Sequence, residues 1–207
     1  MPSLAFKENS PTAAEHSLNP GPVAARRICM VTHSFYERDN RIIRYAEALT
    51  ERGDQVEVVA LRQSAQMLRR ELVNGVLVHR IQDRFGKDEA SPWSYLWPLL
   101  RFVIVSAKWL HTHGQLRKFD LVHVHNIPDF LIFSAWPAKR RGARLILDIH
   151  DIVPEFFASK FGAPPQSLLV RSLRWVEKVS ASVSDHVILS NHLYRAHRGI
   201  SPHWLES

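Results

Sequence analysis

Polar side chains that could bind a ligand or move a proton follow four short apolar runs of the sequence. They form the clusters Thr32-His33-Ser34, His123-Val124-His125-Asn126, Asp148-Ile149-His150-Asp151 and Leu189-Ser190-Asn191. Three of these clusters contain histidine, the side chain whose ordinary pKa suits proton transfer near neutral pH. The four clusters are therefore the candidate positions for chemistry.

The spacing within two clusters predicts which side chains meet. In a strand, residues two positions apart point to the same face, so His123 pairs with His125, and Asp148 pairs with His150. His125 and His150 would then lie at neighbouring strand tips and face one crevice, where Asp148 could orient His150 as a base. The alternative is a core histidine that donates to a backbone carbonyl, and this is the favoured interpretation of His123, which lies deeper in its strand.

Several familiar sites are missing from the sequence. The single cysteine, Cys29, excludes an intrachain disulfide, and its apolar neighbours predict a buried, inert thiol. The twelve histidines include no His-x-x-x-His pair on a helix, so we expect no metal and no cofactor. Neither Gly-x-Gly-x-x-Gly nor Gly-x-x-x-x-Gly-Lys occurs, which argues against a dinucleotide oxidoreductase and a P-loop enzyme.

Short β-branched runs alternate with segments of helical period, and this pattern positions the clusters. It predicts an α/β fold, a Rossmann-like parallel sheet of about six strands with helices on both faces. The expected strands are 28–33, 55–61, 75–81, 120–125, 143–150 and 185–189, with helices after Asn40 and over 66–73. Ligands of such sheets bind at the carboxyl ends of the strands, where the four clusters lie.

The composition indicates a globular chain with a basic surface. Of 207 residues, 45% are hydrophobic, and 27 Lys and Arg against 20 Asp and Glu give a net charge of +7. The proline-studded segment 1–25 is expected to be a flexible tail, and 26–207 one domain. The charge suits acidic lipid or a phosphate-bearing substrate; nucleic acid is not expected, because no aromatic residues are interleaved with the basic ones.

The first loop, residues 33–41, contains no glycine. A glycine cradle for phosphate is therefore excluded there. Any phosphate that reaches this loop would be held by Arg38, by Arg41 and by the N-terminus of the following helix.

The segment Trp93–Gln115 is unusually rich in large apolar residues for a helix of this fold. Pro98, Arg101 and Lys108 argue against a membrane span. One interpretation is a helix clamped between the sheet and another element, and the other is an interfacial helix on an anionic membrane surface. The candidate membrane-surface residues are Trp93, Trp97, Arg101, Lys108 and Trp109.

Several segments together carry a resemblance to a known family. They are Asp39-Asn40-Arg41-Ile42, Phe119-Asp120-Leu121-Val122-His123-Val124-His125-Asn126, Asp148-Ile149-His150-Asp151 and Asp185-His186-Val187-Ile188-Leu189-Ser190, in this order. From about Arg26 to its end, the chain resembles the N-terminal domain of retaining family-4 glycosyltransferases of the GT-B fold. The glycine-rich first loop of many members is absent.

The resemblance implies a domain that faces a second, similar domain across a cleft. That C-terminal domain would hold most of the nucleotide-sugar donor, while this half supplies the acceptor site. By position, the candidate catalytic residues are His125, His150 and Asp151, and the candidate substrate-binding residues are His33, Arg38, Arg41, Asn126, Ser190 and Asn191. No two glutamates lie eight positions apart, so the family's donor-domain Glu-x7-Glu pair is absent here, and we expect a longer protein or a separate donor-binding subunit.

The expected function is transfer of a sugar from a nucleotide sugar to a polysaccharide or lipid-linked acceptor, with retention of the anomeric configuration. The resemblance implies no catalytic metal. The expected location is the cytoplasm or the inner face of the cell membrane. Two alternatives stay open: a non-catalytic membrane-docking module that recruits a donor-binding subunit, and another Rossmann-like nucleotide binder.

Overall fold

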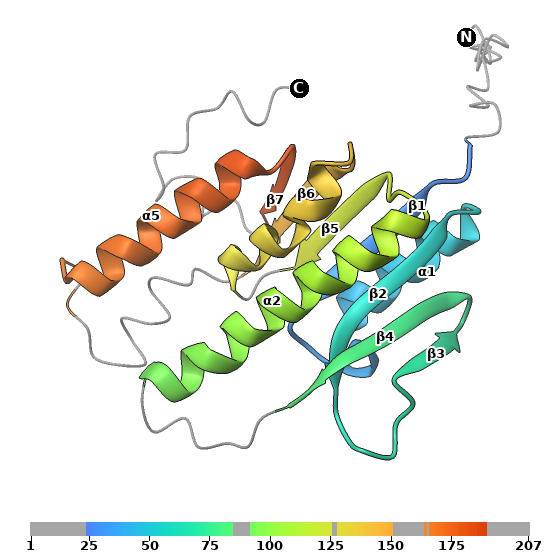
Figure 1. Cartoon of the computed structure of the whole chain (residues 1–207), viewed down its shortest axis with the longest axis horizontal. Helices are drawn as coiled ribbons and strands as arrows, with labels where there is room; N and C mark the ends of the chain where they lie inside the picture. The colour runs from blue at the N-terminus through green and yellow to red at the C-terminus, as the bar shows by residue number, and fades with distance from the viewer. Residues whose placement is uncertain (1–23, 85–91, 126–127, 151–163, 165, 190–207) are drawn as a thin grey trace, which may run out of the picture.

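A seven-stranded sheet forms the centre of the structure, a computed structural model that describes residues 24–84, 92–125, 128–150, 164 and 166–189 (Figure 1). The strands are β1 (Arg27–Thr32), β2 (Gln55–Arg62), β3 (Arg70–Val73), β4 (Val76–Asp83), β5 (Leu121–His125), β6 (Arg144–Ile149) and β7 (His186–Leu189). The helices are η1 (Tyr36–Arg38), α1 (Asn40–Glu51), α2 (Pro92–Leu116), η2 (Asp129–Ala135), α3 (Trp136–Lys139) and α5 (Leu168–Val183). The predicted α/β, Rossmann-like fold class is confirmed.

The strand order is β3-β4-β2-β1-β5-β6-β7, and every pairing except that of β3 with β4 is parallel. The central strands are apolar and buried on both faces, as parallel sheets require. From β1 the chain proceeds to one side through β2, and β5 lies on the other side. The carboxyl ends of β1 and β5 therefore flank the position where strand order reverses, which is the usual ligand position in this class of fold.

Residues 66–73 do not form the predicted helix. They contain a turn and then β3, which pairs with β4 as an antiparallel hairpin and makes the sheet one strand wider than expected. Asn74 and Gly75, at the hairpin turn, have φ values of 49° and 82°. Asn-Gly is the dipeptide that most readily adopts such a turn, so this pair was the signal for a hairpin.

Helices cover both faces of the sheet, as predicted. Helix α1 packs on one face, where Met30, Ile42 and Val58 share a buried cluster. Helix α2 covers the other face (Figure 1), together with η2 and α3. Its Phe102 and Leu110 are fully buried in the core on that face. No helix within the described part of the chain is long and apolar enough to cross a membrane.

Candidate functional site

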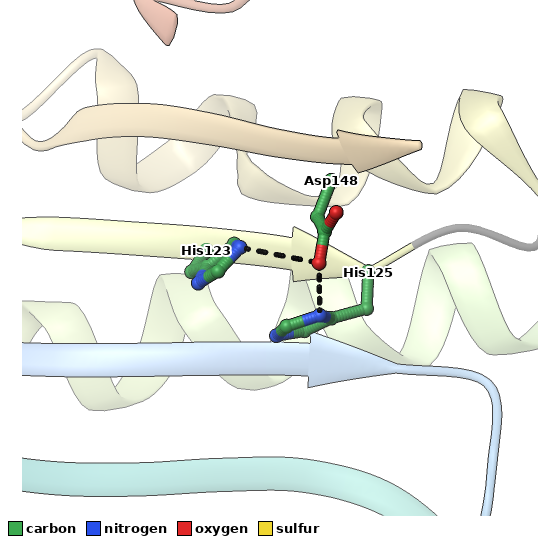
Figure 2. A group of neighbouring side chains, drawn as sticks. All are labelled: His123, His125 and Asp148. Atoms are coloured by element: carbon green, nitrogen blue, oxygen red, sulfur yellow. Dashed lines mark hydrogen bonds and ion pairs between the residues drawn. The ribbon is translucent and has the colours of Figure 1, made fainter. Parts of the chain in front are cut away.

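A buried carboxylate, Asp148 of β6, lies among three histidines at the carboxyl ends of β5 and β6. Its Oδ2 atom is 3.2 Å from Nδ1 of His125, 3.9 Å from Nε2 of His123 and 2.6 Å from Nε2 of His150. Figure 2 shows His123 and His125 projecting from one strand toward the carboxylate of the next. We call these four residues the histidine–aspartate cluster.

Strand register brings this cluster together. His125 pairs with Asp148 across β5 and β6, so their side chains point to the same face of the sheet. His123 lies two residues before His125, and His150 two residues after Asp148, which places all four on that face. The prediction that His125 and His150 meet in one place is confirmed. His123 is buried as expected, but its near neighbour is the Asp148 carboxylate.

Burial and hydrogen bonding set the charges of the cluster. Burial, reinforced by the nearby charge of His125, lowers the pKa of His123 to about 3. Burial also lowers the pKa of His125, although the hydrogen bond to Asp148 opposes that shift. Burial alone would raise the pKa of Asp148, but hydrogen bonds from His125 and His150 outweigh it and lower that pKa. Asp148 is therefore ionised, and His123 and His125 are neutral at neutral pH.

The hydrogen bond also assigns the tautomer of His125. Because Asp148 is ionised, it can only accept, so Nδ1 of His125 donates and Nε2 keeps a lone pair. Within the described part of the chain, no hydrogen-bond partner reaches the buried Nε2 atoms of His123 and His125 or Oδ1 of Asp148. These three atoms can therefore meet a ligand without breaking an existing hydrogen bond.

Helix α1 covers the cluster with an aromatic ring and a guanidinium. The ring of Tyr45 is stacked 6.1 Å from that of His125 and lies 5.6 Å from that of His123. Arg41, one helical turn earlier, acts electrostatically on both histidines and lies 3.6 Å from Asp39. Arg41 thus lies near the cluster, and its predicted contact with a phosphate stays a prediction. Tyr45 was not predicted as a site residue, although its i+4 spacing from Arg41 places both on one helix face.

The loop between β1 and α1 is tied together by its own polar side chains. The hydroxyls of Thr32 and Ser34 are 2.8 Å apart, and Ser34 donates to Asp39 at 3.3 Å. Asp39 also caps α1 by accepting from the backbone N–H of Ile42 at 3.4 Å. A phosphate at this helix N-terminus would meet the Asp39 carboxylate, so the expected contribution of the helix end is weakened and Arg41 is the better-placed basic group.

Two further predicted residues do not join the cluster. His33 lies against α2, with its ring 5.0 Å from that of Phe102, whereas the histidine–aspartate cluster faces α1. Burial, followed by the charge of Arg84, lowers the pKa of His33 to about 4. Arg38 is exposed on η1. Period-two alternation explains the separation of His33, because it follows Thr32 and so points to the opposite face.

Four candidate residues lie outside the described part of the chain. They are Asn126, Asp151, Ser190 and Asn191. Trp93 lies in α2, but its side chain is not described.

The outer face of α2 carries part of the predicted membrane surface. Trp97 is 61% exposed and Ile104 is 65% exposed, with exposed Arg101 and Lys108 on the same side of the helix. Trp109 does not belong to this face.

The indole of Trp109 packs inward at the other end of α2. It stacks on the ring of His113, with centroids 4.0 Å apart, and lies 4.6 Å from the ring of His79. The membrane-surface assignment of Trp109 is therefore corrected: the helical period turns this position toward the sheet, whereas Trp97 faces outward.

A similar face on α5 was missed. Trp175 is 66% exposed and Leu168 is 81% exposed, and Arg171, Arg174 and Lys178 are exposed beside them. Spacings of three and four residues, which place side chains on one helix face, were the available signal.

The comparisons with known proteins agree with this architecture. The family model described as a glycosyl transferase 4-like domain matches residues 40–199. Comparison with curated proteins found no match. Sucrose-phosphate synthase from Thermosynechococcus elongatus superposes with a TM-score of 0.60 at 13% identity, over 83% of this chain and 44% of that chain.

A shorter structure of the same synthase superposes with a TM-score of 0.57 at 14% identity, over 85% of this chain and 83% of that chain. At such identities the likeness concerns the fold. The present chain thus spans less than half the length of the longer synthase structure. Since the family model covers most of the sequence, including α1 and the histidine–aspartate cluster, the chain belongs to the glycosyl transferase 4-like domain family and has the Rossmann-like fold of an N-terminal GT-B domain.

Proposed function

We propose that this domain is the acceptor-side half of a retaining glycosyltransferase. It takes part in moving a sugar from a nucleotide-sugar donor to a polysaccharide or lipid-linked acceptor. The observation that carries the proposal is the Asp148 carboxylate between His125 and His150, at the carboxyl ends of the strands beside the reversal of strand order. Membership in the glycosyl transferase 4-like family supports the reaction class.

In the proposed reaction, the bond between the anomeric carbon and the leaving diphosphate breaks. The acceptor oxygen forms the new bond on the same face of the sugar, and its proton passes to the departing diphosphate. The protein contributes by positioning the reactants and by stabilising charge. His125 and His150 contact the sugar, because their ring nitrogens lie at the strand tips, and Asp148 orients both rings.

Arg41 supplies positive charge near the diphosphate, and the donor nucleotide is bound by a second domain or a separate subunit. The proposed chemistry uses no metal and no further cofactor. Asn126 and Asp151 remain the candidates for contacts to sugar or acceptor hydroxyls, and Ser190 and Asn191 for further substrate contacts.

Replacement of His150 tests the proposal. In the complete enzyme, His150→Ala should lower the rate of sugar transfer by about 100-fold or more, because a positioning contact at the reacting sugar is lost. Transfer of a radiolabelled sugar measures the rate, and circular dichroism verifies folding. The matched control is His111→Ala, an exposed histidine on α2. Full transfer by folded His150→Ala would reject the assignment.

The stereochemistry of the product tests the retaining mechanism separately. Proton NMR of the first-formed product should show the anomeric configuration of the donor. A product of inverted configuration would contradict retention. It would not test the assignment of the site residues, which the His150→Ala experiment tests.

The outer face of α2 favours membrane docking, either as part of this activity or as the role of a non-catalytic module. Trp97 and Ile104 are large, apolar and more than half exposed, and basic residues flank them. Aromatic and aliphatic side chains enter the interfacial region of a bilayer, while Arg and Lys attract anionic lipid. This arrangement suits a protein at the inner face of the cell membrane that reaches a lipid-linked acceptor.

Vesicle binding tests the docking surface. The double variant Trp97→Ser with Ile104→Ser should cosediment with vesicles of phosphatidylcholine and phosphatidylglycerol several-fold less than the unaltered chain, because apolar area is lost. Leu72→Ser, at a 69% exposed position on β3, is the control. Equal binding by the double variant and the unaltered chain would exclude this face as the membrane contact.

A further inference from the structure

Three buried polar atoms of the histidine–aspartate cluster are unsatisfied. They are Nε2 of His123, Nε2 of His125 and Oδ1 of Asp148, and none has a hydrogen-bond partner among the described residues. Buried polar atoms in proteins are nearly always paired, and an exception calls for a ligand, a water molecule or an ion. His123 is 5% exposed and its Nε2 lies 3.9 Å from Oδ2 of Asp148, so an ion between these two atoms would give Nε2 of His123 the partner that it lacks.

We propose that His123, His125 and Asp148 form a binding site for a divalent transition-metal ion, for which Zn²⁺ is the best match. Imidazole nitrogens and a carboxylate oxygen are the ligand types that this ion takes in proteins. Each of the three residues offers one such atom, and these atoms lie within 4.8 Å of one another. His150, whose Nε2 is 2.6 Å from Oδ2 of Asp148, is placed to supply a fourth ligand.

The distances are near those of a bound ion. Bonds of about 2.0–2.1 Å to a tetrahedral zinc place the ligand atoms about 3.3 Å from one another. Oδ2 of Asp148 is already 3.2 Å from Nδ1 of His125 and 3.9 Å from Nε2 of His123 (Figure 2). When the ion binds, Nδ1 of His125 coordinates it in place of donating a hydrogen bond to Asp148, and the proton of the ring lies on Nε2. Small rotations of the side chains close the remaining gap.

The charges also suit a cation. Asp148 is an acidic side chain in a fully buried position, and the imidazoles beside it are themselves ligand types for such an ion. Arg41 acts on the cluster from α1, but Asp39 pairs with it at 3.6 Å and offsets part of its charge. The side chain of His150 is 15% exposed and more accessible than the other three, so the ion would enter from that side.

A motif search of the sequence overlooks this ligand set. His123 and His125 have the two-residue spacing of a strand, and Asp148 follows 23 residues after His125 on the next strand. Only the register of β5 and β6 makes the three residues neighbours.

Metal binding would bear on activity if the proposed function holds, and this consequence rests on that function. An ion bound by Asp148 and His125 would prevent these two residues from contacting the sugar. Zn²⁺ should therefore inhibit sugar transfer, and a chelator should restore it. Binding itself is measured without donor or acceptor, so failure of the metal site and failure of the proposed function are distinguishable.

The site is tested by titrating Zn²⁺ into the chelator-treated chain and measuring the heat of binding by calorimetry. We expect one equivalent to bind with a dissociation constant of about 1 μM or lower and to raise the melting temperature. Asp148→Asn and His123→Gln should each weaken binding by roughly tenfold or more, because each removes one of the ligands. His111→Gln, on the exposed side of α2, should bind as the unaltered chain does.

Two results would overturn the site. One is the absence of binding at about 100 μM Zn²⁺, far above the expected constant. The other is binding that survives in both ligand variants while His111→Gln loses it, which would assign the ion to surface histidines. If the ligand variants do not fold, paramagnetic Co²⁺ is added to the unaltered chain: shifted or broadened ring signals of His123 and His125 in NMR spectra support the site, and unchanged signals reject it.

Discussion

Asp148 illustrates how a buried charge is kept in this domain. Removing a carboxylate from water is costly, and the cost is recovered only where donors surround the ion. Here the donors are His125 and His150, which lower the pKa of Asp148 although burial acts in the opposite direction. The same interactions orient both rings toward the strand tips. Stability and positioning of the candidate catalytic groups therefore depend on one carboxylate.

At the scale of single residues, the buried His33 predicts that the free energy of unfolding depends on pH. Its pKa falls from 6.5 to about 4 on folding, mainly through burial, so the unfolded chain binds more protons between these values. Stability should therefore decrease as the pH falls from about 6.5 to about 4, with His33 contributing at most about 3 kcal/mol, because each pKa unit corresponds to about 1.4 kcal/mol. Urea unfolding of the chain at several pH values measures this change in the free energy of unfolding.

His33→Gln should flatten this dependence, since the group that takes up the proton on unfolding is gone. The control is His111→Gln, at an exposed position. An unchanged pH slope in His33→Gln would show that the imidazole of His33 is not kept neutral by burial.

At the scale of elements, the β3–β4 hairpin shows a local turn signal overriding a helical pattern. Asn74 and Gly75 both adopt positive φ, which most residues reach only at a cost. Gly75 also lies against α1: an added Cβ would meet Cγ2 of Thr50 at 2.7 Å. The hydroxyl of Thr50 donates to the carbonyl of Ala46 at 2.9 Å, which holds that side chain in place. The turn therefore fixes both the hairpin and its approach to α1.

Gly75→Ala should lower the free energy of unfolding by about 2–3 kcal/mol, through backbone strain and contact with Thr50. Gly53→Ala is the matched control, because Gly53 has φ of 96° but no atom within 4 Å of the added Cβ. That variant should lose about 1 kcal/mol through backbone strain alone. Urea unfolding of both variants provides the comparison, and equal losses would show that contact with Thr50 adds nothing.

At the scale of the whole molecule, the two helices with exposed tryptophans cover the same face of the sheet. Helices α2 and α5 both pack beside η2, and α1 lies on the opposite face (Figure 1). Exposed basic residues accompany Trp97 on α2 and Trp175 on α5. Exposed apolar and basic groups of α2 and α5 therefore lie on the side of the sheet away from α1.

This distribution predicts that binding to anionic vesicles is sensitive to salt. Raising the ionic strength from about 0.01 M to about 1 M shortens the screening length from about 30 Å to about 3 Å, so most bound protein should be released. The double variant Arg101→Gln with Lys108→Gln should bind less at low salt, as cosedimentation would show. Arg44→Gln with Arg70→Gln removes the same charge from exposed positions on other elements and is the control. Binding that resists salt would exclude an electrostatic contribution.

The sequence by itself determined the local features of this protein. β-Branched runs located the strands around the site, and period-two alternation placed His123 with His125 and Asp148 with His150, because both signals depend only on near neighbours. The order of the motifs also pointed to the correct family. Arg41 was selected from the sequence as a basic residue of the first loop, which contains no glycine.

Only the tertiary structure decided how these local pieces meet. The register of β5 with β6 sets His125 opposite Asp148, and the packing of α1 adds Tyr45 above the rings. Packing against the sheet likewise turned Trp109 inward and left Trp97 exposed. Strand pairing and helix packing join residues far apart in the chain, so no local period could predict the four-residue cluster or the unsatisfied atoms within it.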